Sequence, residues 1–210
     1  MGKPLGLPHG TGMIRAMQEL RIQQHFIDSA DLQYQVSETL AKPLDAAVQA
    51  LLASVTGGGK VLVAGLGASM TLAQYFSSLL VGGFERERPG LAALTLGADA
   101  VWATAWPGEE ALARQVQALG QAGDVLVLIS THGEELPLAL AVQAAHEREM
   151  TVLAMTGGTG GTAARALRET DVHVCVPHER AARVREVQQL ALHCLCDGID
   201  TQLLGEQEPM

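Results

Sequence analysis

The sequence predicts an α/β fold built on a parallel sheet of five strands, and two observations carry this prediction. Five short runs are nearly continuous in apolar character, as expected of strands that helices cover on both faces. Helical patterns separate these runs, and alternation of strand and helix is typical of a parallel sheet with right-handed crossovers. We expect the strands at residues 61–65, 91–96, 125–130, 151–156 and 172–177.

Helices are expected between these strands and on either side of them. The helices between the strands are expected at residues 70–84, 109–120, 134–150 and 162–169. Two helical stretches, 14–36 and 39–55, come before the first strand, and a helix over 181–204 closes the chain. The second stretch carries an apolar stripe and ends at three successive glycines, since glycine easily takes the left-handed conformation of a helix cap.

The outer helices carry more apolar residues than one face of a sheet needs. We therefore expect part of this surface to lie between subunits of a homo-oligomer. The alternative is that all of it packs within one chain. We expect a disordered N-terminal lead over residues 1–12, oligomerisation helices over 13–56, and one structural unit that joins them to 57–210.

The amino-acid composition argues against two classes of binding partner, nucleic acids and membranes. The chain has 14 Lys and Arg against 23 Asp and Glu, a net charge of −9, so we expect no direct binding to a nucleic-acid backbone, which needs a cationic surface. No apolar run approaches the ~20 residues that cross a bilayer, so no membrane contact is expected. Residues 1–12 have no apolar core typical of a signal peptide, and three cysteines indicate reduced thiols in the cytoplasm.

A glycine-rich turn between the first strand and its helix is the first candidate for a ligand-binding loop. Ligands of open parallel sheets bind at loops that leave the carboxyl ends of the strands. Gly67 allows a tight turn there, and Ser69 lies near a helix N-terminus, where free amides and the helix dipole attract an anion. The alternative is a tight turn with a serine cap and no ligand.

The loop after the third strand, residues 130–135, is the second candidate. Ser130 and Thr131 offer hydroxyl donors at the start of a helix, where phosphate binds well. Glu134 and Glu135 follow, and two carboxylates within reach of a phosphate repel it by roughly 1 kcal/mol or more each. We expect a phosphosugar-binding loop that is partly blocked; the alternative is a set of helix caps alone.

These loops, in this order, resemble the SIS (sugar isomerase) domain family, over about residues 26–204. The motifs that carry the resemblance are residues 65–69, 84–89, 123–133, 183–186 and 194–200. The branch resembled contains phosphoheptose isomerase and DiaA, the protein that associates with the replication initiator DnaA, and residues 84–89 and 194–200 are more similar to DiaA. The resemblance implies a flavodoxin-like three-layer sandwich for the SIS domain, residues 57–210, and assembly as a homotetramer.

The resemblance also implies a catalytic site for an isomerase, and this chain departs from it. The isomerase uses a Glu and a His on the helix after the first loop, with a Gln and a His on the last helix, around a zinc ion. The matching positions are Ser78 and Gln74 on the first of these helices, and Arg185 and His193 on the last. Serine is no base at neutral pH and arginine is no metal ligand, so we expect no catalytic residues, no metal and no cofactor.

We therefore expect a DiaA-like, non-catalytic homotetramer in the cytoplasm that binds an initiator of the DnaA type and retains a sugar-phosphate cleft. Leu203 and Leu204, an apolar pair near the C-terminus, match the positions just beyond the last helix of DiaA that contact the initiator. The alternative is a sugar-phosphate isomerase that converts sedoheptulose 7-phosphate to D-glycero-D-manno-heptose 7-phosphate, with zinc. A phosphosugar-sensing regulator with another partner stays open as a third function.

Overall fold

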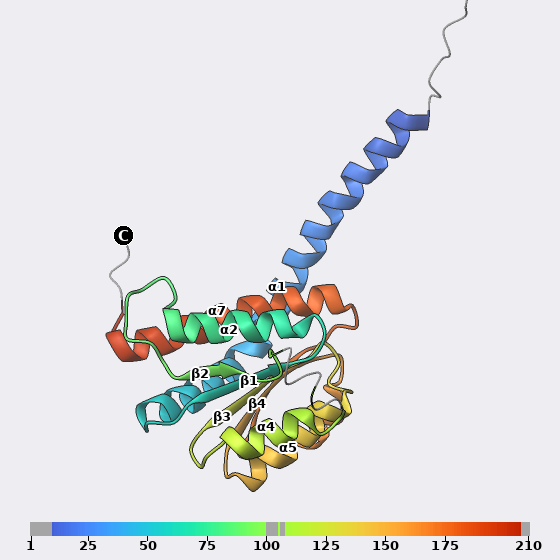
Figure 1. Ribbon diagram of the computed structural model, residues 1–210. Coiled ribbons are helices and arrows are strands. Elements are labelled where there is room, and N and C mark those ends of the chain that lie inside the picture. The colour runs from blue at the N-terminus through green and yellow to red at the C-terminus, as the bar shows by residue number, and fades with distance from the viewer. Residues whose placement is uncertain (1–9, 100–104, 106–107, 207–210) are drawn as a thin grey trace, which may run out of the picture. The chain divides into compact units, whose positions relative to one another are not determined.

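The computed structural model describes residues 10–99, 105 and 108–206, and its centre is a sheet of five parallel strands in the order β2-β1-β3-β4-β5 (Figure 1). The strands are β1 (Val61–Gly65), β2 (Ala93–Thr95), β3 (Val125–Ile129), β4 (Thr151–Gly157) and β5 (Val172–Val176). Every residue of β1 and β3 is buried, as their unbroken apolar sequences predict. The predicted α/β fold with a five-stranded parallel sheet is confirmed.

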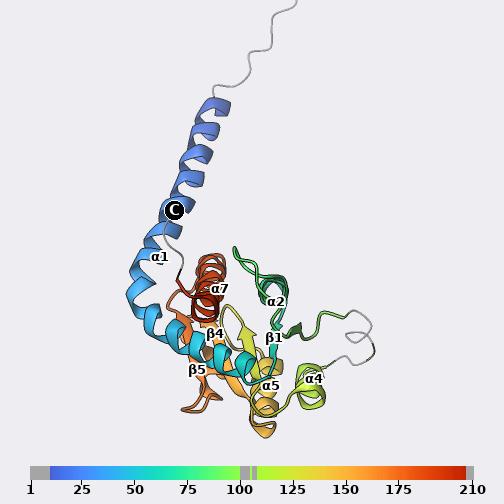
Figure 2. The same cartoon turned by 90° about the vertical axis from the view of Figure 1, so that its left-hand side faces the viewer.

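Helices cover both faces of this sheet. They are α2 (Ser69–Gly82), α4 (Ala111–Leu119), α5 (Leu136–Glu147), α6 (Gly161–Arg165) and α7 (Ala181–Leu204). Figures 1 and 2 show α2 and α7 on one face of the sheet and α4 and α5 on the other. The largest buried side chains, including Phe76 of α2, Leu128 of β3 and Leu192 of α7, fill the space between these layers. The central strands are therefore shielded from water on both faces, whereas Leu94 of the edge strand β2 is 48% exposed.

The N-terminal helix differs from the expectation in length and continuity. A single helix, α1, runs over Gly10–Thr56, where the sequence indicated two stretches and a lead extending to residue 12. The helix continues through both stretches, and the hydroxyl of Thr39 donates to the carbonyl of Val36 within it. Pro43 also lies inside the helix. The rest of the predicted lead, residues 1–9, lies outside the described residues.

The chain divides into two compact units, one up to residue 35 and one from residue 36 onward. Within the second unit, the end of α1 buries Leu40, Ala47 and Leu51. Val48 of α1 packs against Gly198 of α7 so closely that a methyl group added to Gly198 would lie 2.7 Å from a Val48 side-chain carbon. Gly57 follows the last helical residue, and Gly58 has a φ of +82°, so the predicted glycine stop is confirmed.

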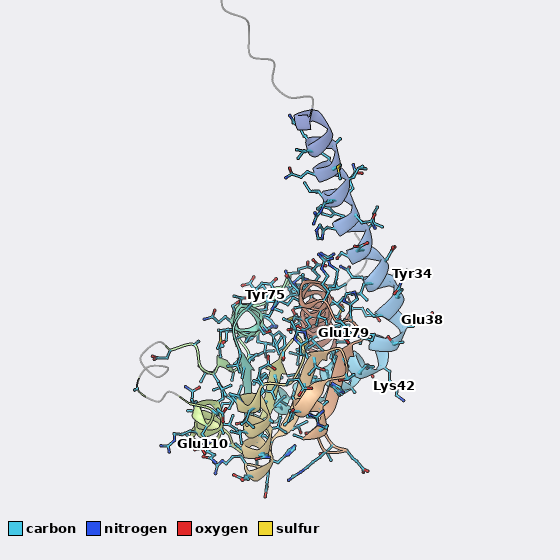
Figure 3. All side chains as sticks on the ribbon, turned by 90° about the vertical axis from the view of Figure 1, so that its right-hand side faces the viewer. Tyr34, Glu38, Lys42, Tyr75, Glu110 and Glu179 are labelled. Carbon is cyan, nitrogen blue, oxygen red and sulfur yellow. The ribbon has the colours of Figure 1, made fainter. Side chains whose placement is uncertain are left out.

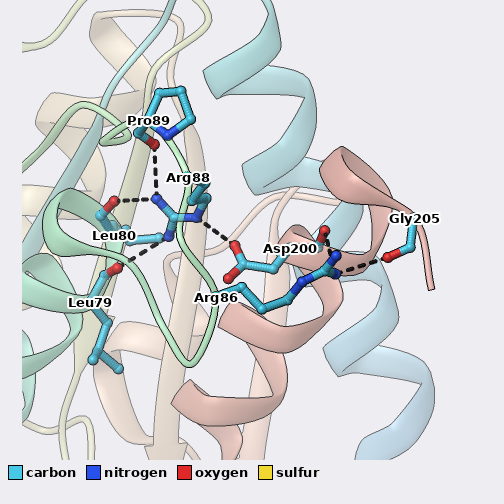
Figure 4. A network of polar contacts seen from close by, with 7 residues as sticks. All are labelled: Leu79, Leu80, Arg86, Arg88, Pro89, Asp200 and Gly205. Atoms are coloured by element: carbon cyan, nitrogen blue, oxygen red, sulfur yellow. Dashed lines mark hydrogen bonds and ion pairs between the residues drawn. The ribbon is translucent and has the colours of Figure 1, made fainter. Parts of the chain in front are cut away.

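A buried ion pair fixes the C-terminal end of α2 to α7 (Figure 4). The Nε of Arg88 lies 2.5 Å from a carboxylate oxygen of Asp200, and both side chains are 1% exposed. The same guanidinium donates to the carbonyl oxygens of Leu80 and Leu79 at 2.8 and 3.1 Å. These bonds satisfy carbonyls at the end of α2 that no further helical turn could reach.

Candidate functional site

The two predicted ligand loops lie side by side at the carboxyl ends of neighbouring strands. Gly65, the last residue of β1, is paired with Ile129, the last residue of β3. The loop from Leu66 to Ala68 and the loop that begins at Ser130 therefore leave the sheet next to each other. This is the edge where ligands bind in open parallel sheets.

The first loop is a tight turn that continues directly into α2. Gly67 has a φ of +54°, which favours glycine, and a methyl group on Gly65 would lie 2.6 Å from the carbonyl oxygen of Ser69. The amide of Ser69 donates to Leu66 and the amide of Met70 donates to Gly67, both at 3.1 Å. Two amides of the first turn are thus engaged within the turn. Ser69 itself is buried, and the helix cap, Ala68, makes no side-chain capping bond.

Ser130 organises the second loop. Its Oγ accepts hydrogen bonds from the amides of Gly133 and His132 at 2.8 and 3.1 Å. The same hydroxyl donates to the carboxylate of Glu135, whose two oxygens lie 3.0 and 2.8 Å away. Ser130 is 1% exposed, so the carboxylate of Glu135 lies directly over a buried hydroxyl donor. The structure thus brings Ser130 and Glu135 together; that this contact opposes a bound phosphate stays a prediction.

The two glutamates of this loop point in different directions. The carboxylate of Glu134 accepts a hydrogen bond from the hydroxyl of Thr162 at 2.8 Å and lies 3.5 Å from the guanidinium of Arg165. The bond from Thr162, with the charge of Arg165 as a smaller cause, lowers the pKa of Glu134. The expectation that both carboxylates crowd the loop is therefore wrong for Glu134, which turns toward α6. Thr131, also predicted as a ligand, is buried, and its hydroxyl lies 2.9 Å from Nδ1 of His132.

Gln188 links α7 to this edge of the sheet, and the sequence analysis missed it. Its Nε2 donates to the carbonyl oxygens of Ser130 and Met155 at 2.7 and 3.2 Å. The side chain is fully buried, and its Oε1 has no hydrogen-bond partner within the part of the chain that the structure describes. A polar residue between the apolar Val184, Val187 and Ala191 of α7 was the signal that could have found it.

A cluster of aromatic rings joins α2 to α7, the two helices that cover one face of the sheet. The hydroxyl of Tyr75 lies 2.9 Å from Nε2 of His193, and Figure 3 shows Tyr75 on α2 with α7 beside it. The ring of Phe84 stacks on the imidazole of His193 at 5.3 Å between centroids and 23° between planes. Tyr75 meets the same imidazole edge-on at 5.7 Å. Tyr75 and His193 are both half-buried, so each keeps some contact with solvent.

The structure corrects the residues expected opposite His193. Gln74 and Ser78 are both exposed on the outer side of α2, and the hydroxyl of Ser78 donates to the carbonyl of Tyr75. Successive residues of a helix are turned by about 100°, so the neighbours Gln74 and Tyr75 lie on different faces of α2. Tyr75 is the residue of α2 that meets His193. Arg185 lies on α7 eight residues before His193, about 12 Å along the helix axis, and its Nε is buried with no hydrogen-bond partner among the described residues.

The residues present do not fit a zinc ion. Protein zinc sites use three or four nitrogen, sulfur or carboxylate ligands. Among the residues that the structure describes, no group of three or more His, Cys, Asp or Glu side chains could hold a metal. The Nε2 of His193 is instead occupied by the phenol of Tyr75. No chemical step is therefore assigned to a metal.

The three cysteines are free thiols, and the pKa values of Cys194 and Cys196 are raised. Burial, with the charge of Asp200 as a second cause, raises the pKa of Cys196 to about 12. Burial also raises the pKa of Cys194. A thiol with a raised pKa is a poor nucleophile at neutral pH.

The last turn of α7 carries the predicted partner-binding pair. Leu203 and Leu204 are 38% and 41% exposed. That they contact another protein stays a prediction. None of the helices in the described parts of the chain is long and apolar enough to span a membrane.

Comparison with known proteins identifies the family. Residues 24–157 match the model of the SIS domain. The chain is 55% identical to a phosphoheptose isomerase of Methylibium petroleiphilum over 91% of its own length and 98% of the relative's. Two solved structures are similar along nearly their whole length: phosphoheptose isomerase GmhA of Neisseria gonorrhoeae (TM-score 0.81, 39% identity, 87% of this chain and 99% of that one) and a phosphoheptose isomerase of Francisella tularensis (TM-score 0.84, 36% identity, 88% and 98%).

These relatives overturn two expectations from the sequence. The main reading of a non-catalytic, DnaA-binding protein is wrong, because the homologues are named as an enzyme, phosphoheptose isomerase. The expectation that the chain is no enzyme is contradicted by the same finding. No comparison supports the finer similarity to DiaA or an initiator partner. The chain belongs to the SIS-domain family, and its homologues are phosphoheptose isomerases.

Proposed function

We propose that this chain is a phosphoheptose isomerase, which interconverts the ketose and aldose forms of a seven-carbon sugar phosphate. One observation carries the proposal: 55% identity to a protein of that name along 98% of that protein's length. A match of this extent includes the sheet edge, the helix after β1 and the last helix. The function therefore does not rest on the fold alone, which other activities share.

The sheet edge supplies groups suited to the phosphate of such a substrate. We assign phosphate binding to Gly67 and Ser69 of the first loop and to Ser130 and Thr131 of the second. Buried hydroxyls and backbone amides at a helix start bind phosphate through directed hydrogen bonds. Glu135 belongs to the same site, and its carboxylate leaves the hydroxyl of Ser130 when the phosphate arrives.

The two ligand loops and the Tyr75–His193 pair have separate roles in this proposal. The loops after β1 and β3 hold the phosphate, and the pair on α2 and α7 faces the carbonyl end of the sugar. Aldose–ketose isomerisation needs a base to take a proton from carbon and an acid to protonate the carbonyl oxygen. Histidine and tyrosine are among the side chains that perform these tasks.

We also propose a homotetramer in the cytoplasm, with the helix over residues 13–56 as its assembly element. Large apolar side chains along the first half of α1 support this arrangement, including Phe26 at 74% exposed and Ile14 at 66%. An apolar surface of this kind is typical of a subunit interface. Three free cysteines favour a reducing compartment.

The test of the proposed function is turnover of sedoheptulose 7-phosphate by the purified full chain. We expect conversion to D-glycero-D-manno-heptose 7-phosphate, and a raised KM in the Ser130→Ala variant, because a buried donor to phosphate is lost. The Thr71→Ala variant, whose hydroxyl bonds within the first turn of α2, is the matched control and keeps the wild-type KM. Folded protein that binds the sugar phosphate and never converts it would contradict the proposal.

A further inference from the structure

We infer that Tyr75 and His193 are the acid and the base of the isomerisation, as a pair that works without a metal ion. This inference rests on the proposed function and adds the residues and the kind of chemistry. It concerns one contact, the 2.9 Å between the phenol oxygen and Nε2 of the imidazole.

The pair is built and held by its neighbours. Phe84, which follows α2, stacks on one face of the His193 ring, and Tyr75 meets its edge, so the imidazole is oriented from two directions. The Arg88–Asp200 ion pair ties the same two helices together further along. A side chain whose position is fixed by packing and hydrogen bonds can act on a substrate with little loss of freedom. Both rings are half-buried, so each keeps some exposure to solvent.

The donor set favours proton transfer over metal binding. A phenol and one imidazole are too few ligands for zinc, and the exposed Gln74 and Ser78 on α2 point elsewhere. No third His, Cys, Asp or Glu joins them to form a metal-binding group anywhere in the described ranges 10–99, 105 and 108–206. A phenol and an imidazole at hydrogen-bond distance can, however, exchange and store a proton. The site therefore matches general acid–base chemistry.

Tyr75 and His193 are sufficient for every proton transfer of the isomerisation. Substrate binding replaces the bond between the side chains: the C2 carbonyl oxygen takes the phenol hydrogen bond of Tyr75, and C1 faces Nε2 of His193. The C1–H bond breaks and its proton goes to Nε2, while the electron pair forms the C1–C2 double bond. The carbonyl π electrons move to the C2 oxygen, which takes the phenol proton and completes an enediol.

The second half returns both protons. The phenolate of Tyr75 takes the proton from the C1 hydroxyl, the C1 carbonyl forms, and C2 takes the proton held by His193. The aldose leaves, and both side chains return to their starting states without any oxidant or other co-reactant. Between the two halves the phenolate and the imidazolium carry opposite charges a few ångströms apart, so each stabilises the other.

The experiment compares variants and metal content in the full chain, with sedoheptulose 7-phosphate as substrate. After dialysis against EDTA we expect unchanged turnover, with no gain when zinc is added. The Tyr75→Phe variant removes one oxygen atom, and we expect kcat to fall about 100-fold or more with little change in KM, in line with the loss of a general acid. The neighbouring Gln74→Ala variant is the matched control and keeps wild-type kinetics.

His193→Asn provides a second arm, and thermal unfolding verifies that each variant is folded. Turnover that is lost with EDTA and restored by zinc overturns this inference and leaves the proposed function standing. Metal-independent turnover with an unaffected Tyr75→Phe variant also overturns it. No turnover under any condition overturns the proposed function, and the acid–base pair falls with it.

Discussion

At the scale of single residues, we expect Glu135 to control how an anion binds to the loop after β3. Its carboxylate accepts the hydrogen bond of the Ser130 hydroxyl, at 2.8 Å to the nearer oxygen. A bound phosphate needs this same donor and meets the carboxylate's negative charge. Two like charges about 4 Å apart near a protein surface repel by roughly 4 kcal/mol before screening, so we expect the charge of Glu135 to weaken phosphate binding.

Replacement of Glu135 by Gln is therefore expected to strengthen binding of sugar phosphate and of inorganic phosphate. Removal of the charge keeps the side chain's size, and a gain of about 1.4 kcal/mol corresponds to a tenfold lower Kd. Isothermal titration calorimetry measures the change. Glu134→Gln is the matched control, because Glu134 bonds to Thr162 and leaves the loop. An equal gain in both variants, or none in Glu135→Gln, would show that the contact with Ser130 does not control the site.

His173 of β5 links stability to pH. Burial lowers its pKa, and its Nε2 lies 2.7 Å from the hydroxyl of Thr156. A histidine whose pKa is lowered by folding favours the folded state above its unfolded pKa of about 6.5, and this contribution is lost as the pH falls. We expect His173→Gln to lower the melting temperature at pH 8. We also expect a smaller difference between the melting temperatures at pH 8 and pH 5 in this variant than in the wild type. A wild-type difference that the variant leaves unchanged would assign the pH dependence to other groups.

At the scale of elements, α2 and α7 form the frame of the candidate site. The hydrogen bond between Tyr75 and His193 and the Arg88–Asp200 ion pair both join these helices. Arg86 adds a bond from the same loop to the carbonyl of Gly205, just after α7 (Figure 4). The distance between the two helices thus depends on a buried charge pair.

Asp200→Asn is expected to destabilise the fold by about 3–5 kcal/mol, because the guanidinium of Arg88 would remain buried without its counter-charge. Urea unfolding measures the change in the free energy of unfolding. Asp197→Asn, an exposed position on the same helix, serves as control and is expected to change it by less than about 0.5 kcal/mol. A similar loss in both variants would assign the effect to the helix and not to the ion pair.

The sequence predicted the elements better than their contacts. Five apolar runs located all the strands, since strands covered on both faces carry an unmistakable apolar pattern. The edge strand β2 is only Ala93–Thr95, shorter than predicted, because an apolar run does not say how much of it finds a partner. The continuous α1 was missed, since the polar residues between the two stretches are compatible with a loop or a solvent-exposed turn of helix.

The candidate site could be predicted only in part, because some of its contacts join elements that are far apart in the sequence. The pairing of Ser130 with Glu135 lies within six residues and could be anticipated from charge and spacing. Tyr75 and His193 are 118 residues apart, and their meeting depends on the rotation of α2 against α7. Neighbouring residues of a helix are turned by about 100°, so the sequence alone does not show that Tyr75, and not Gln74, faces His193.

At the scale of the whole molecule, the fold brings together residues that are far apart in the sequence. Parallel strands bring the two candidate ligand loops to one edge of the sheet, and α2 and α7 on one face bring Tyr75 to His193. The first half of α1 adds an exposed apolar surface that the unit from residue 36 onward does not need for its own core.

Assembly is expected to depend on that surface. The Phe26→Asp variant places a charge at a 74% exposed apolar position, and burial of an unpaired charge in an interface is costly. Light scattering with size exclusion measures the mass, with a wild-type tetramer of about four times 22.1 kDa expected and a smaller species in the variant. Gln23→Asp, an exposed polar position on the same helix, is expected to keep the wild-type mass. A Phe26→Asp variant of unchanged mass would locate the interface elsewhere.

The metal-free isomerisation is tested most directly by measuring how much deuterium the sugar's carbon atoms take up during turnover in D₂O. The EDTA-treated full chain is mixed with sedoheptulose 7-phosphate, and NMR detects both product and deuterium at the carbons that exchange protons. We expect aldose product with deuterium at C2, because the proton held on His193 exchanges with solvent before it returns to carbon. We expect neither product nor exchange with His193→Asn. A folded protein that binds the sugar phosphate and yields no product and no exchange would contradict the proposed reaction.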